Sequence, residues 1–144
     1  MQVRIAAIDF GKRKIGLAIS DPFQSLSLPL PTLRIEPNTS LQKIVEHILK
    51  QLKDYDMETV IIGHPIEMSG NIGKMAKEVE EFALLFENLS SLKTVLWDER
   101  LSSKQADQTL RHENIKRKKR DALNDSLAAM LLLQSYLDYL AYKN

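Results

Sequence analysis

Three segments rich in apolar residues follow one another in the first quarter of the chain, with only short turns between them. They are Val3–Ile8, Ile15–Ser20 and Ser25–Arg34, and segments of this kind are typical of β-strands. A turn as short as the first one permits only antiparallel pairing, so the first two strands are expected to form a hairpin. Two prolines in the third segment remove ladder donors, which predicts a strand at an edge of the sheet.

Strands and helices alternate in the rest of the chain. Thr59–Ile62 and Lys93–Trp97 are predicted strands. Helices are predicted for about residues 41–52, for a segment with apolar residues from 72 to 86, for a short stretch ending at 110, and for about 121–142. The order β-β-β-α-β-α-β-α-α favours an α/β fold with a five-stranded mixed sheet, in which three antiparallel strands are followed by parallel strands and helices flank the sheet.

Length and composition limit the class of protein. The 144 residues suit a single domain spanning 1–144. The absence of cysteine excludes disulfides and cysteine zinc sites, and it fits a reducing compartment. No signal-peptide pattern precedes the first strand, and the longest apolar run, Leu127–Leu133, is too short for a membrane span. We therefore expect a cytoplasmic protein without membrane contact.

Acidic residues lie in or directly after three predicted elements: the first strand, the last strand and the final helix. The predicted fold can bring all three to one edge of the sheet. Asp9 ends the first strand, Asp98 and Glu99 end the last strand, and Asp125 interrupts an apolar stretch of the final helix. Ligands of open α/β sheets collect at the carboxyl ends of the strands. Convergent carboxylates bind Mg²⁺, and two such ions activate water and stabilise the leaving oxygen in phosphodiester cleavage.

Each of these acids also has a structural interpretation. Asp9 could be a turn or cap residue. Asp98 or Glu99 could pair with Arg100 or cap the helix that follows. Asp125 could face solvent at a helix N-terminus, where its charge suits the helix dipole, and Asp121 one turn earlier is a candidate helper or a capping residue.

Four segments together resemble the YqgF family, also called RuvX. They match its opening Asp-x-Gly motif, its strand-Gly-x-Pro segment, its Asp-Glu-Arg motif and its C-terminal Asp-x-x-Ala-Ala motif. In this chain the segments are Asp9–Asp21, Val60–Pro65, Trp97–Ala106 and Asp125–Ala129. They occur in the family's order and span nearly the whole chain.

The resemblance implies a fold, an activity and a set of site residues. Members are described as Holliday junction resolvases or as nucleases of the 16S ribosomal RNA precursor, with an RNase H-like fold related to RuvC. Asp9, Glu99 and Asp125 are then the expected catalytic residues and ligands of Mg²⁺ or Mn²⁺, as two ions, with Asp98 a further candidate ligand. The expected function is processing of the 16S rRNA precursor in ribosome biogenesis.

The chain departs from the family pattern at two places near these motifs. His64 stands where the family usually has leucine, and Glu67-Met68-Ser69-Gly70 replaces a segment that tends to read Asn-Met-Asp-Gly. Both departures could alter substrate contacts, and His64 could assist proton transfer. Glu67 could join the acidic site, or it could be a solvated loop residue.

Basic residues cluster beside the candidate ligands, although the net charge is only +1. One run is Lys12-Arg13-Lys14, a second is Lys116-Arg117-Lys118-Lys119-Arg120, and Arg100 follows Glu99. Basic residues in such positions favour phosphate contacts, which position a nucleic-acid backbone without reading its sequence. Expected partners are structured RNA, ribosomal precursor particles and branched DNA, with the protein a monomer or weak homodimer.

Two other functions are compatible with parts of the pattern. The same fold could serve as a non-catalytic nucleic-acid-binding factor in transcription, although carboxylates facing phosphate would be of no use to it. Asp-x-Gly followed by a hairpin also opens actin-like ATPase domains, but those enzymes enclose the nucleotide between two such domains.

Overall fold

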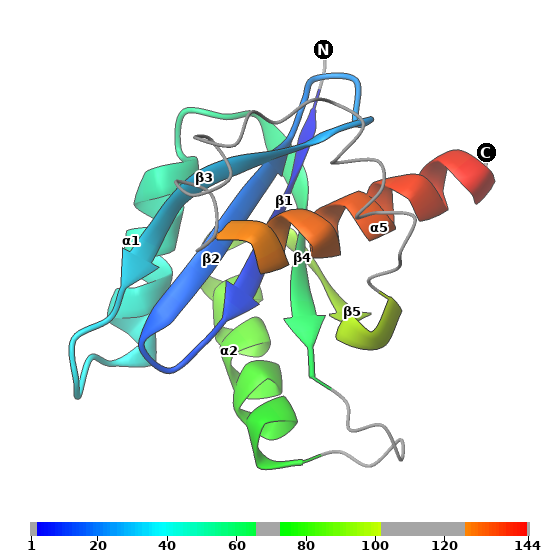
Figure 1. The fold of residues 1–144 in the computed structure, drawn as a ribbon. Helices are drawn as coiled ribbons and strands as arrows, with labels where there is room; N and C mark the ends of the chain where they lie inside the picture. The colour runs from blue at the N-terminus through cyan, green and yellow to red at the C-terminus, as the bar shows by residue number, and fades with distance from the viewer. Residues whose placement is uncertain (1–2, 66–72, 102–125, 144) are drawn as a thin grey trace.

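The computed structural model describes residues 3–65, 73–101 and 126–143. These residues contain a five-stranded sheet of order β3-β2-β1-β4-β5 (Figure 1). Its strands are β1 (Arg4–Phe10), β2 (Lys14–Ser20), β3 (Ser27–Arg34), β4 (Met57–His64) and β5 (Lys93–Asp98). Strands β1, β2 and β3 pair antiparallel, whereas β1, β4 and β5 pair parallel. The mixed sheet, the first hairpin and the edge position of the proline-containing strand are thus confirmed.

Strand β3 begins at Ser27, two residues after its predicted start, but the other four strands extend further than the apolar segments that predicted them. Strand β1 includes Asp9 and Phe10, which pair with Gly16 and Ile15 of β2, so the turn is shorter than expected. Strand β4 begins at Met57 and ends at His64. Backbone ladders continue beyond the buried core because their hydrogen bonds do not depend on apolar side chains. As a result, Asp9 is held by strand pairing and does not lie in a free turn.

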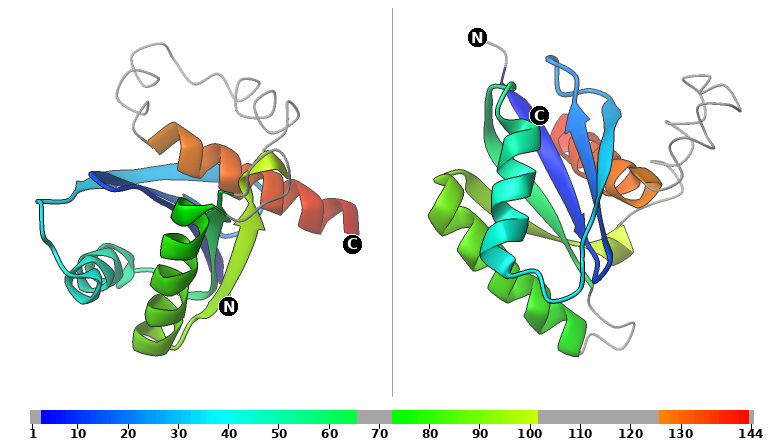
Figure 2. Two further views of the ribbon diagram at one scale, coloured as in Figure 1. Left: turned by 90° about the horizontal axis from the view of Figure 1, so that it is seen from below. Right: turned by 90° about the vertical axis from the view of Figure 1, so that its left-hand side faces the viewer.

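Helices cover both faces of the sheet. Helices α1 (Leu41–Leu52) and α2 (Lys74–Ser90) lie on one face, and α5 (Leu127–Lys143) lies on the other (Figure 2). The hydroxyl of Ser40 accepts a hydrogen bond from the backbone N–H of Lys43 at 3.2 Å and so caps the N-terminus of α1. Among the described residues, no helix is long and apolar enough to cross a lipid bilayer. The short helix expected to end at residue 110 lies outside the described residues.

Side chains alternate between two buried layers along the central strands. Ile8, Ile62 and Phe82 belong to the layer between the sheet and α1 and α2. Ala7, Ile61 and other apolar residues belong to the layer beneath α5. Successive side chains of a strand point to opposite faces, so the face of every strand-end residue follows from its buried neighbours.

A buried glutamine joins α5 to the edge strand. The side-chain oxygen of Gln134 accepts from the backbone N–H of Ser27 at 2.9 Å. Its nitrogen donates to the carbonyl oxygen of Ser25 and to Asp138 Oδ1, each at 3.0 Å. Gln134 and its bond with the Ser27 N–H are buried, whereas the bonds to Ser25 and Asp138 are partly buried. They set where α5 lies across the sheet.

Replacing this glutamine should destabilise the protein. Gln134→Leu keeps much of the side-chain volume but leaves the Ser27 N–H without its partner, which should lower the free energy of unfolding by about 2 kcal/mol. Urea unfolding followed by circular dichroism measures the change. The matched control is Gln42→Leu on the exposed face of α1, where a change within about 0.5 kcal/mol is expected. Equal stability of the two variants would contradict the assigned role of Gln134.

Candidate functional site

The parallel strands bring the sequence-predicted acids to one edge of the sheet. In the register of the sheet, Ile8 pairs with Ile62, Gly63 with Trp97 and His64 with Asp98. The carboxyl ends of β1, β4 and β5 therefore meet at the edge that is lowest in Figure 1. Asp9 comes from β1, and Glu99 begins the short 3-10 helix η1 (Glu99–Leu101) directly after β5. This 3-10 turn was not predicted from the sequence.

Asp9 and Glu99 lie together on the face that α5 covers. Asp9 is two residues after Ala7 in β1, and Ala7 belongs to the layer beneath α5. A side-chain hydrogen bond joins the two carboxyl groups. Both side chains are half-buried. The structure therefore brings together the first-strand and last-strand acids that were expected to share a site.

Gly63 leaves room for this carboxyl pair. A β-carbon at position 63 would lie 2.7 Å from Glu99 Oε1, 3.1 Å from Glu99 Cγ and 3.2 Å from Leu132 Cδ2. The first of these distances is shorter than carbon and oxygen tolerate without bonding. The Glu99 carboxyl thus occupies the space above the Gly63 backbone, beside Asp9, and α5 closes that space from the other side.

Trp97 anchors the end of β5 against α5. Its indole N–H donates to the Ser135 hydroxyl at 2.8 Å, and its ring meets Tyr136 edge-on with 5.0 Å between centroids. Trp97 is partly buried in the layer beneath α5, two residues before Glu99. This packing fixes the direction in which the chain leaves the strand, and so it positions Glu99.

Both carboxyl groups resist ionisation. Burial raises the pKa of Asp9, and the hydrogen bond with Glu99 offsets part of that increase. Burial also raises the pKa of Glu99, and the negative charge of Asp9 raises it further. Two half-buried acids whose pKa values are both raised by burial form a site that a cation would stabilise. Hard oxygen donors of this kind suit Mg²⁺ and Mn²⁺.

Asp98 does not join this pair. It neighbours His64 in the sheet register, on the face of α2, and its carboxylate binds Arg100. Hydrogen bonds from Arg100 hold the pKa of Asp98 below its usual value, against the smaller effect of burial. The expectation that one of the two adjacent acids pairs with Arg100 and caps a helical turn is fulfilled by Asp98.

His64 also points away from the carboxyl pair. Its Nε2 lies 3.1 Å from Glu80 Oε1 of α2, and its side chain is 13% exposed. The residue that stands in place of the family's leucine therefore makes a polar contact between β4 and α2. This contact directs the imidazole toward α2 and not toward Asp9 and Glu99.

Several candidate residues lie outside the described residues. They are Asp125, Glu67, Asp121 and the run Lys116-Arg117-Lys118-Lys119-Arg120. Ser126, which directly follows Asp125 in the sequence, is buried and donates to the Leu30 carbonyl oxygen at 2.8 Å. Within residues 3–65, 73–101 and 126–143, no group of three acidic or histidine side chains could hold a metal ion.

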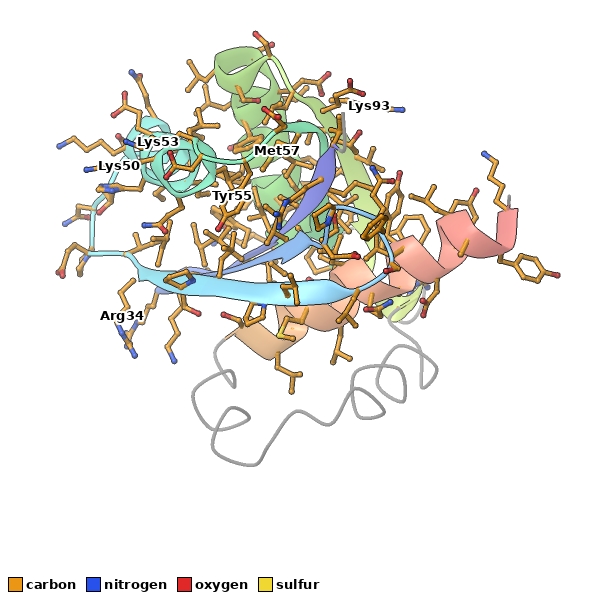
Figure 3. All side chains as sticks on the ribbon, turned by 90° about the horizontal axis from the view of Figure 1, so that it is seen from above. Arg34, Lys50, Lys53, Tyr55, Met57 and Lys93 are labelled. Carbon is orange, nitrogen blue, oxygen red and sulfur yellow. The ribbon has the colours of Figure 1, made fainter. Side chains whose placement is uncertain are left out.

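Basic side chains occupy the same edge of the sheet as Asp9, and two of them also lie on the same face. Lys12, Arg13 and Lys14 are exposed at the β1–β2 turn. Lys14 pairs with Arg34 of β3, and both lie on the face covered by α5, because their neighbours Ile15 and Leu33 pack on the other face. In Figure 3 the Arg34 side chain points away from α1, whereas Lys93 lies at the start of β5, at the opposite edge.

Arg34 was missed in the sequence because it stands far from every motif. A prediction of the β2–β3 register would have found it, since the register alone sets Arg34 beside Lys14. That register includes an irregularity between Ile15 and Leu17, which sequence alternation does not reveal.

Solved structures share the fold. The RuvC protein of Thermus thermophilus matches with a TM-score of 0.65 and 14% identity, over 98% of this chain and 97% of that one. A structure described as T. thermophilus RuvC in complex with Holliday junction substrate matches with a TM-score of 0.64 and 16% identity, over 97% and 96% of the two chains. The fold is therefore RNase H-like.

Sequence comparison then assigns the family. The profile of the RuvX family, described as Holliday junction resolvase, matches residues 3–139. Two relatives are each described as "Putative pre-16S rRNA nuclease". The one from Protochlamydia amoebophila is 41% identical over 94% of this chain and 93% of its own. The one from Desulfitobacterium hafniense is 37% identical over 99% and 96%. The chain belongs to the RuvX family.

Removing one acid of the carboxyl pair should stabilise the metal-free protein at neutral pH. Because folding raises the pKa of Asp9 and Glu99, their protonated forms favour the folded state, and this contribution is lost as the pH rises through the folded pKa values. In EDTA at neutral pH, Asp9→Asn should therefore unfold at a higher temperature than the parent protein. The difference should shrink toward pH 3, and differential scanning calorimetry across this range measures it.

Asp21→Asn is the contrasting control. Burial acts to raise the pKa of Asp21, but N–H groups of Leu26 and Ser25 outweigh it and lower the pKa. This substitution should destabilise the protein at neutral pH and have least effect at low pH. If Asp9→Asn behaves in the same way as Asp21→Asn, the carboxyl pair is not a site of charge repulsion.

Filling the space above Gly63 should displace Glu99. Gly63→Ala places a methyl group against Glu99 and Leu132, which should cost about 1–3 kcal/mol of unfolding free energy. In the double variant Gly63→Ala/Glu99→Ala the obstructing side chain is shortened, so most of this cost should disappear. Urea denaturation of the two single variants and the double variant measures the coupling. Strictly additive effects would show that Gly63 and Glu99 do not meet.

Proposed function

We propose that this protein is a divalent-metal-dependent nuclease that cleaves phosphodiester bonds in the precursor of 16S rRNA during ribosome biogenesis. The half-buried pair of Asp9 and Glu99, at the carboxyl edge of an RNase H-like sheet, carries the proposal. The names of the relatives at 37% and 41% identity support the substrate. The proposed setting is the cytoplasm, on ribosomal precursor particles, with the protein a monomer or weak homodimer.

Asp9 and Glu99 would bind the metal together with Asp125. Mg²⁺ or Mn²⁺, in two sites, is the proposed cofactor. Oxygen donors fit these ions, and the raised pKa values of Asp9 and Glu99 fit a site that is completed by positive charge. When bound, such ions supply Lewis-acid stabilisation for charge on the phosphate oxygens. The role of the chain is to hold the carboxyl groups in place through strand pairing and through the close approach of Glu99 to Gly63.

Basic residues would hold the nucleic-acid backbone across this edge. Lys12, Arg13 and Lys14 are exposed at the turn beside Asp9, and Arg100 follows Glu99. The run Lys116-Arg117-Lys118-Lys119-Arg120 is proposed to contribute further phosphate contacts. Arg34 is added to this set because it shares the edge and face of Lys14. Contacts of this type orient the strand and leave sequence selection to the shape of the RNA.

Resolution of branched DNA is the second candidate function. It is favoured by the description of the family, Holliday junction resolvase, and by the fold shared with RuvC over almost the full length of both chains. The same carboxyl pair would serve either substrate, because both reactions cleave a phosphodiester.

The test compares Asp9→Asn with the parent protein on two substrates, a precursor 16S rRNA fragment and a four-way DNA junction, in Mg²⁺ and in Mn²⁺. Mutation of a residue that only hydrogen-bonds to a metal ligand lowers metal affinity or activity roughly 10- to 100-fold. Loss of a ligand should therefore slow cleavage by at least about 100-fold, while binding measured by gel shift stays within a few-fold.

The matched control is Asp54→Asn, an exposed acid between α1 and β4. Its cleavage rate should equal that of the parent protein. Undiminished cleavage by Asp9→Asn would refute the assigned site. Faster cleavage of the junction than of the RNA would favour the second candidate function.

A further inference from the structure

Asp98 and Arg100 stand on either side of Glu99 and are joined by a set of hydrogen bonds. Asp98 Oδ1 accepts from the Arg100 backbone N–H at 2.9 Å and from Nε at 3.1 Å. Asp98 Oδ2 accepts from Nε at 3.0 Å and from Nη2 at 2.7 Å. Both oxygens of the carboxylate are therefore engaged by one residue.

This arrangement fixes a side chain that would otherwise be free to rotate. The backbone bond closes a turn at the end of β5, and the side-chain bonds hold the guanidinium plane against the same carboxylate. Exposed ion pairs contribute little to folding stability. Here the Arg100 side chain is 38% exposed. Its hydrogen bonds with Asp98 therefore do more to orient Arg100 than to stabilise the fold.

Asp98 lies on the face of the sheet that α2 covers, because its neighbour Trp97 packs on the other face. His64 is its neighbour in the β4–β5 register, and His64 contacts Glu80 of α2. One contact joins Glu80 of α2 to His64 of β4, and another joins Asp98 of β5 to Arg100 of η1. Arg100 is thus a cation held at the carboxyl edge of the sheet, directly after Glu99 in the chain.

We infer that Asp98 is a positioning residue, which orients the Arg100 guanidinium to bind a phosphate of the nucleic-acid strand beside the phosphate that is cleaved at Asp9 and Glu99. This assigns Asp98 a role other than metal binding, because its oxygens are committed to Arg100. The inference rests on the proposed nuclease function. It adds Asp98, which would act on substrate binding only through Arg100.

Kinetics on the precursor 16S rRNA fragment, at saturating Mg²⁺, tests this role. Asp98→Asn keeps the shape of the side chain but turns one acceptor into a donor that faces the guanidinium. It should raise KM roughly tenfold and leave kcat within about twofold. Arg100→Gln should do the same, and it keeps the test valid if Asp98→Asn does not fold. Asp54→Asn again serves as the unchanged control.

The double variant Asp98→Asn/Arg100→Gln decides whether Asp98 acts through Arg100. If it does, the KM of the double variant equals that of Arg100→Gln alone. The slope of log affinity against log salt concentration should fall by about one in each single variant, as expected for loss of one phosphate contact. Additive effects on KM, or an unchanged slope, would overturn the inference.

Calorimetric titration with Mn²⁺, without nucleic acid, separates positioning from metal binding. Glu99→Gln should lose affinity for the ion, whereas Asp98→Asn should keep it within about twofold. A loss in Asp98→Asn equal to that in Glu99→Gln would make Asp98 a ligand and refute the positioning role. A parent protein that cleaves neither substrate would refute the proposed function and the inference together, whereas active protein with an unchanged KM in Asp98→Asn would refute the inference alone.

Discussion

The close approach of Asp9 and Glu99 is the constraint on which the rest of the site depends. Two acids do not settle beside each other in a half-buried position without external support, because burial raises the pKa of both and the charge of Asp9 raises the pKa of Glu99 further. The support comes from the parallel pairing of β1, β4 and β5 and from the absence of a side chain at Gly63. The carboxyl pair is unfavourable in itself, and the apolar packing on both faces of the sheet supplies the stability that keeps it in place. Such local costs are common at functional sites.

The two faces of the sheet edge have different chemistry. On the face of α5 lie the carboxyl pair and the basic neighbours Lys14 and Arg34. On the face of α2, Asp98 and His64 are engaged by Arg100 and Glu80. Strand alternation alone produces this division, since adjacent residues such as Asp98 and Glu99 leave the strand on opposite sides. One acid is therefore available to a cation while its neighbour organises an arginine.

Much of the site could be predicted from the sequence because its signals are local. Asp9 follows an apolar strand, Asp98 and Glu99 follow another, and the order of strands and helices predicts that these ends meet. Arg34 escaped prediction because its place depends on the register of β2 with β3, where an irregularity shifts the pairing. The 3-10 turn at Glu99 also escaped, because three residues carry no periodic pattern.

The sequence by itself determined the family, the mixed sheet and the acids that belong to its carboxyl edge, because strand patterns and motifs are properties of contiguous residues. The family resemblance already favoured Glu99 over Asp98 as the partner of Asp9, but only the tertiary structure shows what brings Glu99 there. Its position depends on which side of β5 faces α5, where Trp97 bonds to Ser135, and on the space that Gly63 of the neighbouring strand leaves open for Glu99. These contacts join residues from separate elements, so they exist only once the chain is packed.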